Sequence, residues 1–321
     1  MRVILSAQDQ KDLHYEVECI LRMFLPQLRL DFAQAEAEPS SEQVVIVTGE
    51  GENTVTLSVP GFFGEEREPA SASRKDTEAS VCRCLYRLLV RATGKKISWG
   101  VLTGIRPVKL VRELREQGLS YGEIAGRFTR RYLTTPEKAA LCIQTDQVQQ
   151  AAIGKAEPKG YSLYLSIPFC PSRCSYCSFV SHSIEKTRRL IPAYLDRLEE
   201  ELIYTAKIAR EKGLTLQTIY MGGGTPTVLE AEQLDRLLET VNQNFDRSRC
   251  LEFTVEAGRP DTITKAKLEA LVRGGVDRIS VNPQTLNNEV LQTVGRKHTA
   301  EEFFQAYDLA KQFPFTAINI D

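Results

Sequence analysis

The chain has 321 residues, of which 42% are hydrophobic, and its 41 lysines and arginines nearly balance its 42 aspartates and glutamates. A chain of this length can bury a sizeable core, and we expect two domains rather than one. It contains no apolar stretch of about 18 residues and no basic leader followed by an apolar segment, so we expect a cytoplasmic protein without a membrane span.

Residues 1–92 are predicted to form a small α+β domain, and a helical connector follows at residues 93–157. In the connector, Gly104 and Pro107 mark a turn before one helix, and a second helix begins at Thr135 as its cap with Pro136 in the first turn. Strands of the first domain are expected at 2–6, 27–32, 43–49 and 53–60, and its helices at 15–25 and 79–90.

Charge is unevenly distributed over these two segments. Residues 1–82 carry 7 basic and 15 acidic side chains, whereas residues 83–131 carry 12 basic and 3 acidic ones. A basic block can bind an anionic partner, but Lys and Arg also line the solvated faces of most amphipathic helices, and we favour that second interpretation. The aromatic residues of the block show no repeated stacking pattern, so nucleic acid is not expected as a partner.

Residues 158–321 change to short apolar runs that alternate with helical ones. This pattern is typical of successive βα units, and it predicts a parallel sheet in a partial, TIM-like (β/α) barrel, with a doubly wound sheet as the alternative. The last strand has no covering helix after it, so we expect a chain truncated after its fifth barrel strand. Strands are expected at 161–167, 218–222, 251–257, 278–282 and 316–321, and helices at 187–212, 230–244, 262–273, 286–293 and 300–312.

The stretch "SIPFCPSRCSYCSF" places Cys170, Cys174 and Cys177 at the end of the first barrel strand. Three thiolates can bind three irons of a [4Fe-4S] cluster and leave the fourth iron open for another ligand. There are two alternatives. The first is a zinc site, but structural zinc needs a fourth ligand, and only His182 is near in the sequence. The second is three free cysteines without a metal. The other five cysteines are predicted to be buried without a chemical role: Cys19, Cys82, Cys84, Cys142 and Cys250.

Polar or glycine-rich segments follow the next three strands. The run "GGGTPT" can bring backbone close to a ligand or can simply form a tight turn. Glu256 ends the third strand and Gln284 follows the fourth. Because the carboxyl ends of parallel strands meet at one edge of a barrel, we expect these side chains in a shared cleft.

Together these motifs resemble a known family. "CPSRCSYC" with "GGGTP" resembles the radical S-adenosylmethionine (SAM) superfamily. The wider set "YLSIPFCPSRCSYCSF", "GGGTPT", "VEAGRPDT", "RISVNPQT", "GRKHTAEE" and "INID" resembles the oxygen-independent coproporphyrinogen III oxidase group over residues 161–321. With "WGVLTGIRPVK" in front, the chain is most similar to the HemZ-type branch.

The resemblance implies a role for individual residues. The amino and carboxylate groups of SAM would chelate the open iron of a cluster held by Cys170, Cys174 and Cys177. A first SAM molecule would be contacted by Tyr164, Tyr176, Gly223 and Glu256. A second would be contacted by Gly224, Thr225, Gln284, Arg296 and Asp321.

The resemblance also implies the reaction. An electron from a flavodoxin- or ferredoxin-type donor would pass through the cluster and cleave SAM, and the resulting radical would take hydrogen from a propionate side chain. Loss of carbon dioxide and an electron would leave a vinyl group, and two such steps convert coproporphyrinogen III to protoporphyrinogen IX. Since this tetrapyrrole carries four carboxylates, Arg106 and Lys109 in the basic block are candidates for contacting it.

The sequence departs from the family pattern in three segments. Phe179 stands where the oxidases carry a further cysteine, and in this respect the chain is similar to the related haem chaperones. Arg259 precedes the proline of the third-strand motif, and Asn282 with Pro283 replaces a glycine-containing turn. A haem-binding chaperone without oxidase activity, or a radical SAM enzyme for another tetrapyrrole, is therefore the alternative function.

Overall fold

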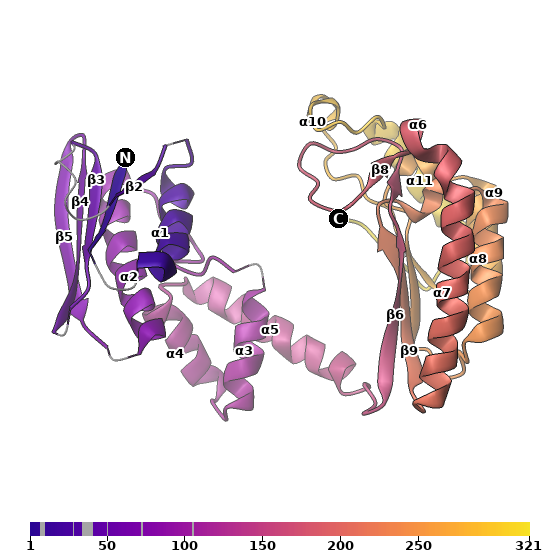
Figure 1. Cartoon of the computed structure of the whole chain (residues 1–321), viewed down its shortest axis with the longest axis horizontal. Helices are drawn as coiled ribbons and strands as arrows, with labels where there is room; N and C mark the ends of the chain where they lie inside the picture. The colour runs from indigo at the N-terminus through magenta and orange to yellow at the C-terminus, as the bar shows by residue number, and fades with distance from the viewer. Residues whose placement is uncertain (7–9, 28, 34–40, 50, 72, 105) are drawn as a thin grey trace. The chain divides into compact units, whose positions relative to one another are not determined.

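The computed structural model describes residues 1–6, 10–27, 29–33, 41–49, 51–71, 73–104 and 106–321. The chain divides into two compact units, Met1–Lys155 and Ala156–Asp321 (Figure 1). Among the described residues, no helix combines the length and the apolar character needed to cross a membrane.

The first unit contains a five-stranded sheet with the order β2-β1-β3-β4-β5. The strands β1, β2 and β3 are parallel, and β4 and β5 extend the sheet as antiparallel neighbours. Helices α1 and α2 cover one face and share its apolar core (Figure 1). The strands span Arg2–Ser6 (β1), Asp31–Ala33 (β2), Gln43–Val47 (β3), Glu52–Val59 (β4) and Phe62–Pro69 (β5), and the helices Gln10–Phe24 (α1) and Arg74–Thr93 (α2).

Strand β5 was not predicted, because "FFGEEREP" is mostly polar and reads as a loop. It forms because Gly61, at a φ of 78°, closes a tight turn that lays the segment antiparallel along β4. Glu66 and Glu68 of this strand form ion pairs with three arginines of α2, namely Arg83, Arg87 and Arg91. Arg87 lies 3.6 Å from Glu66 and 2.8 Å from Glu68. Part of the basic block is thus neutralised by the acidic segment before it, which supports the helix-face interpretation of this charge.

Three helices follow and form a small core of their own. A capping box between Ser120 and Glu123 begins α4, and the side chain of Thr135 accepts the backbone N–H of Lys138 at the start of α5, as the sequence predicts. The helices span Pro107–Glu116 (α3), Tyr121–Arg131 (α4) and Pro136–Ile153 (α5).

The second unit contains an all-parallel sheet with the order β6-β9-β10-β11-β12. Each strand lies beside the strand that precedes it in this series, which is the winding of a barrel and excludes a doubly wound sheet. The predicted α/β class is confirmed. The strands span Gly160–Ile167 (β6), Thr215–Gly223 (β9), Glu252–Glu256 (β10), Arg278–Ser280 (β11) and Ala317–Asn319 (β12).

Helices cover one face of this sheet (Figure 1). On β6, Leu163, Leu165 and Ile167 are buried toward them, whereas the alternating Ser162 and Tyr164 point to the other face. The strands are therefore not continuously apolar as expected, because polar side chains occupy the concave face. The long helices span Ile191–Glu211 (α7), Ala231–Asn244 (α8), Lys265–Arg273 (α9) and Ala300–Ala310 (α11), and the short elements Phe169–Cys170 (β7), His182–Ser183 (β8), Ile184–Thr187 (α6) and Asn288–Thr293 (α10).

Candidate functional site

A cleft of about 280 Å³ lies at the carboxyl ends of the barrel strands. Cys170 in β7 and Cys174 and Cys177 in the loop after it line this cleft, and the hydroxyl of Thr225 lies 3.4 Å from the Cys170 sulfur. Of the predicted cluster ligands and SAM contacts, only Tyr164 is not in the wall, and the candidate substrate contacts Arg106 and Lys109 do not line it either. The predicted residues that line the cleft are Cys170, Cys174, Cys177, Tyr176, Gly223, Gly224, Thr225, Glu256, Gln284, Arg296 and Asp321.

The cysteine loop is tied to two turns of the barrel edge. Arg259, after β10, donates through Nη2 to the backbone oxygen of Ser172 and lies 3.1 Å from its hydroxyl. The Ser172 hydroxyl donates in turn to the backbone oxygen of Gly295 at 2.7 Å, and the N–H of Ser175 donates to Val294 at 3.0 Å. These contacts hold the loop between Cys170 and Cys177 against the turns after β10 and α10.

The glycine run packs against the backbone of β6 and β7, in addition to lining the cleft. The N–H of Gly224 donates to the carbonyl oxygen of Ile167, and that of Thr225 donates to the carbonyl oxygen of Phe169, both at 2.8 Å. These two amides therefore bind the β6–β7 backbone and are not available to a ligand. A Cβ on Gly224 would lie 2.6 Å from the Phe169 carbonyl oxygen. Gly223 has a φ of 107°, which disfavours any other residue.

Glu256 is held by a residue that the sequence reasoning missed. The hydroxyl of Tyr220 donates to its carboxylate at 2.6 Å, and Tyr164 stacks on Tyr220 with ring centroids 5.8 Å apart. Burial raises the pKa of Glu256, while the bonds from Tyr220 and from the N–H of Gly223 oppose that rise. Tyr164 does not line the cleft, and it is connected to Glu256 in the wall through Tyr220. The signal was available, because Tyr220 is on the polar face of "TIYMG".

Four of the predicted residues form a chain of hydrogen bonds across the cleft. Arg296 donates to the hydroxyl of Tyr176 at 3.4 Å, and this hydroxyl donates to Gln284 at 2.9 Å. Gln284 donates through its side chain to the carboxylate of Asp321, and its backbone N–H does so at 3.2 Å. Gln284 has a φ of 66°, which is uncommon for a residue with a side chain and is found at functional sites.

The thiols and polar atoms that line the cleft suit an iron-sulfur cluster and a polar organic ligand. Three thiols lie in one wall, and buried atoms of Arg259, Arg296, Asn282 and Ser181, all of which line the same cleft, have no hydrogen-bond partner among the described residues. Such atoms are expected where a polar ligand completes the site. No three His, Cys, Asp or Glu of the described residues are arranged around a single metal ion. In a cubane each cysteine binds a different iron, and the three thiols with the unpartnered polar atoms beside them are the donor set that a cluster with a polar ligand would need.

His182, the candidate fourth ligand for zinc, is exposed in β8 and does not line the cleft. The other five cysteines lie away from it. Burial raises the pKa of Cys82 to about 12 and that of Cys84 to about 11, so these thiols stay protonated, and Cys142 is also buried. Cys19 and Cys250 are only half-buried.

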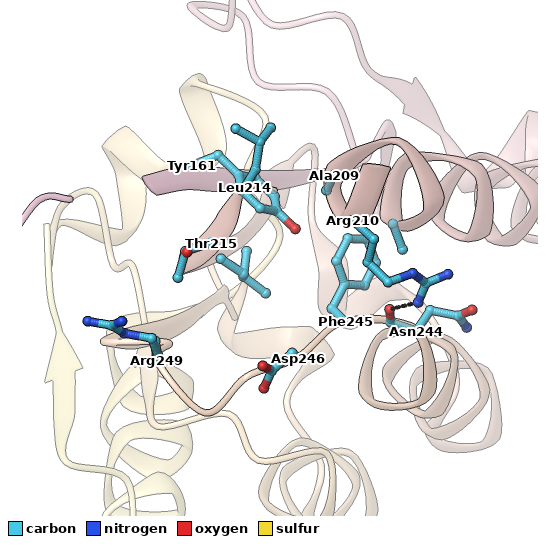
Figure 2. Close-up of a pocket in the computed structure, with 11 residues that line it drawn as sticks. Tyr161, Ala209, Arg210, Leu214, Thr215, Asn244, Phe245, Asp246 and Arg249 are labelled. Atoms are coloured by element: carbon cyan, nitrogen blue, oxygen red, sulfur yellow. Dashed lines mark hydrogen bonds between the residues drawn. The ribbon is translucent and has the colours of Figure 1, made fainter. Parts of the chain in front are cut away.

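A second, smaller pocket of about 130 Å³ lies at the opposite end of the sheet, beside Tyr161 of β6 and Thr215 of β9 (Figure 2). Its arginines are occupied within the protein. Arg210 donates to the backbone oxygen of Asn244 at 3.1 Å, as Figure 2 shows, and Arg249 forms an ion pair with Glu157. Barrel enzymes place their sites at the carboxyl ends of the strands, so the cysteine-lined cleft is the candidate site.

Comparison with known proteins agrees with this assignment. Residues 164–320 match the family model of the radical SAM superfamily. The chain is 34% identical to the oxygen-independent coproporphyrinogen-III oxidase-like protein HemZ of Bacillus subtilis, in an alignment that covers 100% of this chain and 66% of the relative. It is 38% identical to the heme chaperone HemW of Bacillus subtilis over 50% of this chain and 41% of the relative.

A third relative is the oxygen-independent coproporphyrinogen III oxidase of Escherichia coli, which is 31% identical over 60% of this chain and 41% of the relative. A solved structure of coproporphyrinogen III oxidase from the same organism superimposes with a TM-score of 0.47, at 31% identity, over 55% of this chain and 39% of that one. The chain therefore spans 66% of the length of the HemZ relative and 41% of the other two.

Proposed function

Residues 164–320 are a radical SAM domain, so the chain belongs to the radical SAM superfamily, and we propose that its cleft holds a [4Fe-4S] cluster and SAM for a reaction on a tetrapyrrole. The convergence of three cysteines with residues from four other strand ends on one cleft supports this proposal. The sequence similarity adds that the group to which the chain is related contains coproporphyrinogen oxidases, HemZ and the HemW chaperones.

In this proposal, Cys170, Cys174 and Cys177 hold the cluster. When bound, the reduced cluster and SAM supply the one-electron chemistry that removes a hydrogen atom from the substrate. Ser172 accepts a hydrogen bond from Arg259 and donates one to the backbone oxygen of Gly295, and both bonds hold the loop that carries the cysteines. A preformed loop lowers the entropy that ligand binding would otherwise have to overcome.

The side chains around the cysteines would bind and orient SAM. Burial disfavours the ionised form of Glu256 and raises its pKa, so a bound cation would stabilise that form, and we propose the amino group of SAM as this cation. Tyr220 and Tyr164 position Glu256 for this contact. A second SAM molecule would contact Arg296, Gln284 and Asp321, which belong to the hydrogen-bonded chain, whereas Tyr176 between Arg296 and Gln284 would contact the first.

As the specific reaction, we propose oxidative decarboxylation of two propionates of coproporphyrinogen III to vinyl groups, which gives protoporphyrinogen IX. The 34% identity to an oxidase-like protein over both units supports this choice, whereas the chaperone similarity covers half of the chain. The electron would come from a reduced flavodoxin or ferredoxin. A haem chaperone of the same group is the second candidate, and the HemW similarity together with Phe179 favours it.

One experiment separates the two. The protein is reconstituted anaerobically with iron and sulfide, reduced, and incubated with SAM and coproporphyrinogen III, and products are resolved by liquid chromatography and mass spectrometry. Vinyl products formed together with 5'-deoxyadenosine support the oxidase. Stoichiometric haem binding without any vinyl product would instead support the chaperone, and Cys174→Ser is the control that should abolish SAM cleavage.

A further inference from the structure

Two arginines in the wall of the cleft are buried cations without a carboxylate partner among the residues described. Arg259 is 3% exposed and Arg296 is 5% exposed. Arg259 donates only to oxygens of Ser172, and Arg296 donates to the hydroxyl of Tyr176 and to backbone oxygens of Gly258 and Asn282 at 2.7 Å. Within the part of the chain that the structure describes, Nη1 of Arg259 and Nε of Arg296 have no hydrogen-bond partner.

The two guanidinium groups are near each other in the fold. Arg296 binds the carbonyl of Gly258, which is the residue before Arg259 in the chain. Both charges, together with burial, lower the pKa of His298, whose ring is also buried. This end of the cleft is therefore a concentration of positive charge that hydrogen bonds to neutral oxygens do not balance.

The nearby carboxylates do not neutralise it. Glu256 accepts its bond from Tyr220, and Asp321 accepts from Gln284. The charge of Asp261 favours protonation of His298, which raises the pKa of that ring, but in the described part of the chain Asp261 forms no ion pair with either arginine. An arginine cannot lose its proton, so burial of an uncompensated guanidinium is strongly unfavourable, and an anionic ligand would relieve it.

We propose that Arg259, together with Arg296, binds a carboxylate of the ligand in this cleft, which gives Arg259 a binding role in addition to its contact with the cysteine loop. Each arginine contributes one nitrogen donor, Nη1 of Arg259 and Nε of Arg296, that has no partner among the described residues, and a carboxylate has two oxygens to accept them. The carboxylate comes from the amino-acid end of SAM or from a propionate of the tetrapyrrole, and in this the inference rests on the proposed function.

The test is a comparison of ligand pairs that differ only in the carboxylate. SAM is compared with decarboxylated SAM, and coproporphyrin III with its tetramethyl ester in the same detergent, by anaerobic titration of the reconstituted 321-residue chain. The variants are Arg259→Gln, which removes the charge, and Arg259→Lys, which keeps the charge without the fork. Arg247→Gln is the matched control, because Arg247 also has a buried, unpartnered Nε and binds the carbonyls of Gly274 and Gly275 far from the cleft.

For one of the two pairs, the wild-type chain should prefer the carboxylate ligand by about tenfold to a hundredfold. Arg259→Gln should reduce that preference severalfold, Arg259→Lys should retain more of it than Arg259→Gln does, and Arg247→Gln should leave it unchanged. The pair that responds identifies the source of the carboxylate.

If Arg259→Gln weakens both members of each pair equally, the arginine only supports the loop, and the inference is wrong. An unchanged preference in Arg259→Gln would also overturn it, with the proposed function left standing. If the wild-type chain binds none of the four ligands, both the inference and the proposed function are wrong.

Discussion

Gly224 offers a direct test of how the cysteine-bearing strand is positioned. A Cβ at this residue would lie 2.6 Å from the carbonyl oxygen of Phe169 and 2.9 Å from that of Ile167, and these atoms are backbone, so they cannot rotate away. Gly224 has no positive φ, and the effect of Gly224→Ala is therefore steric. We expect this variant to displace β7 and with it Cys170.

The magnitude follows from the same distances. To bring the contact with Phe169 to an ordinary 3.4 Å, the backbone must move by about 0.8 Å. Such a shift would stretch the 2.8 Å bonds from the amides of Gly224 and Thr225 beyond hydrogen-bonding range. Overpacking together with strained or lost buried hydrogen bonds should lower the free energy of unfolding of the second unit by about 2–4 kcal/mol. For a unit of this size the midpoint temperature should fall by about 5–15 °C.

The assay is anaerobic thermal unfolding followed by far-UV circular dichroism, with iron and sulfide content after reconstitution as a second reading. Gly258→Ala is the matched control, since a Cβ there meets nothing closer than 3.5 Å, from Asn282, and should change stability by less than about 0.5 kcal/mol. Trp99, the only tryptophan, lies in the first unit, and its fluorescence transition should be unchanged. Equal stability and equal cluster content in Gly224→Ala and Gly258→Ala would refute the crowding argument.

Three further predictions concern other residues. Burial raises the pKa of Glu256, so the native state binds the carboxyl proton more tightly than the unfolded state does. The wild-type protein therefore loses stability as the pH rises through this raised pKa. Glu256→Gln has no such proton to lose and should gain stability relative to wild type between about pH 4 and pH 7, measured by denaturant unfolding at a series of pH values. Tyr176→Phe removes two hydrogen bonds of the cleft and should weaken SAM binding about tenfold by equilibrium dialysis, whereas Tyr204→Phe on the exposed surface should not. Glu68→Gln breaks a largely buried ion pair and should cost about 2 kcal/mol in the Trp99 transition, against less than about 0.5 kcal/mol for the exposed Glu113→Gln.

The pattern of the sequence was sufficient for the parallel sheet and for most of the candidate site. Strands and helices of the second unit alternate with clear periodicity, and the rule that sites occupy the carboxyl ends of strands brings Glu256 and Gln284 into the cleft with the cysteines. The pattern could not distinguish barrel from doubly wound winding, since strand order depends on tertiary pairing and not on local preference.

Other features depended on contacts between segments distant in the chain. Strand β5 was missed because its stability comes from pairing with β4 and from ion pairs with α2. The amides after Gly223 bind the neighbouring backbone because β6 and β9 approach closely, which a glycine run alone does not reveal. The role of Tyr220 toward Glu256 likewise requires the register between β9 and β10. Arg259 was identified only as a departure from a motif, and its burial emerges from the fold.

The central claim is that Cys170, Cys174 and Cys177 hold a cluster that enables SAM cleavage in this cleft. The most direct test measures 5'-deoxyadenosine formed by the anaerobically reconstituted, reduced protein and by three variants with serine at each cysteine in turn. Cys250→Ser is the control, since Cys250 lies at the opposite end of the sheet. The account predicts 5'-deoxyadenosine from the wild type and the control and none from the three variants. Undiminished formation in any of the three would contradict it.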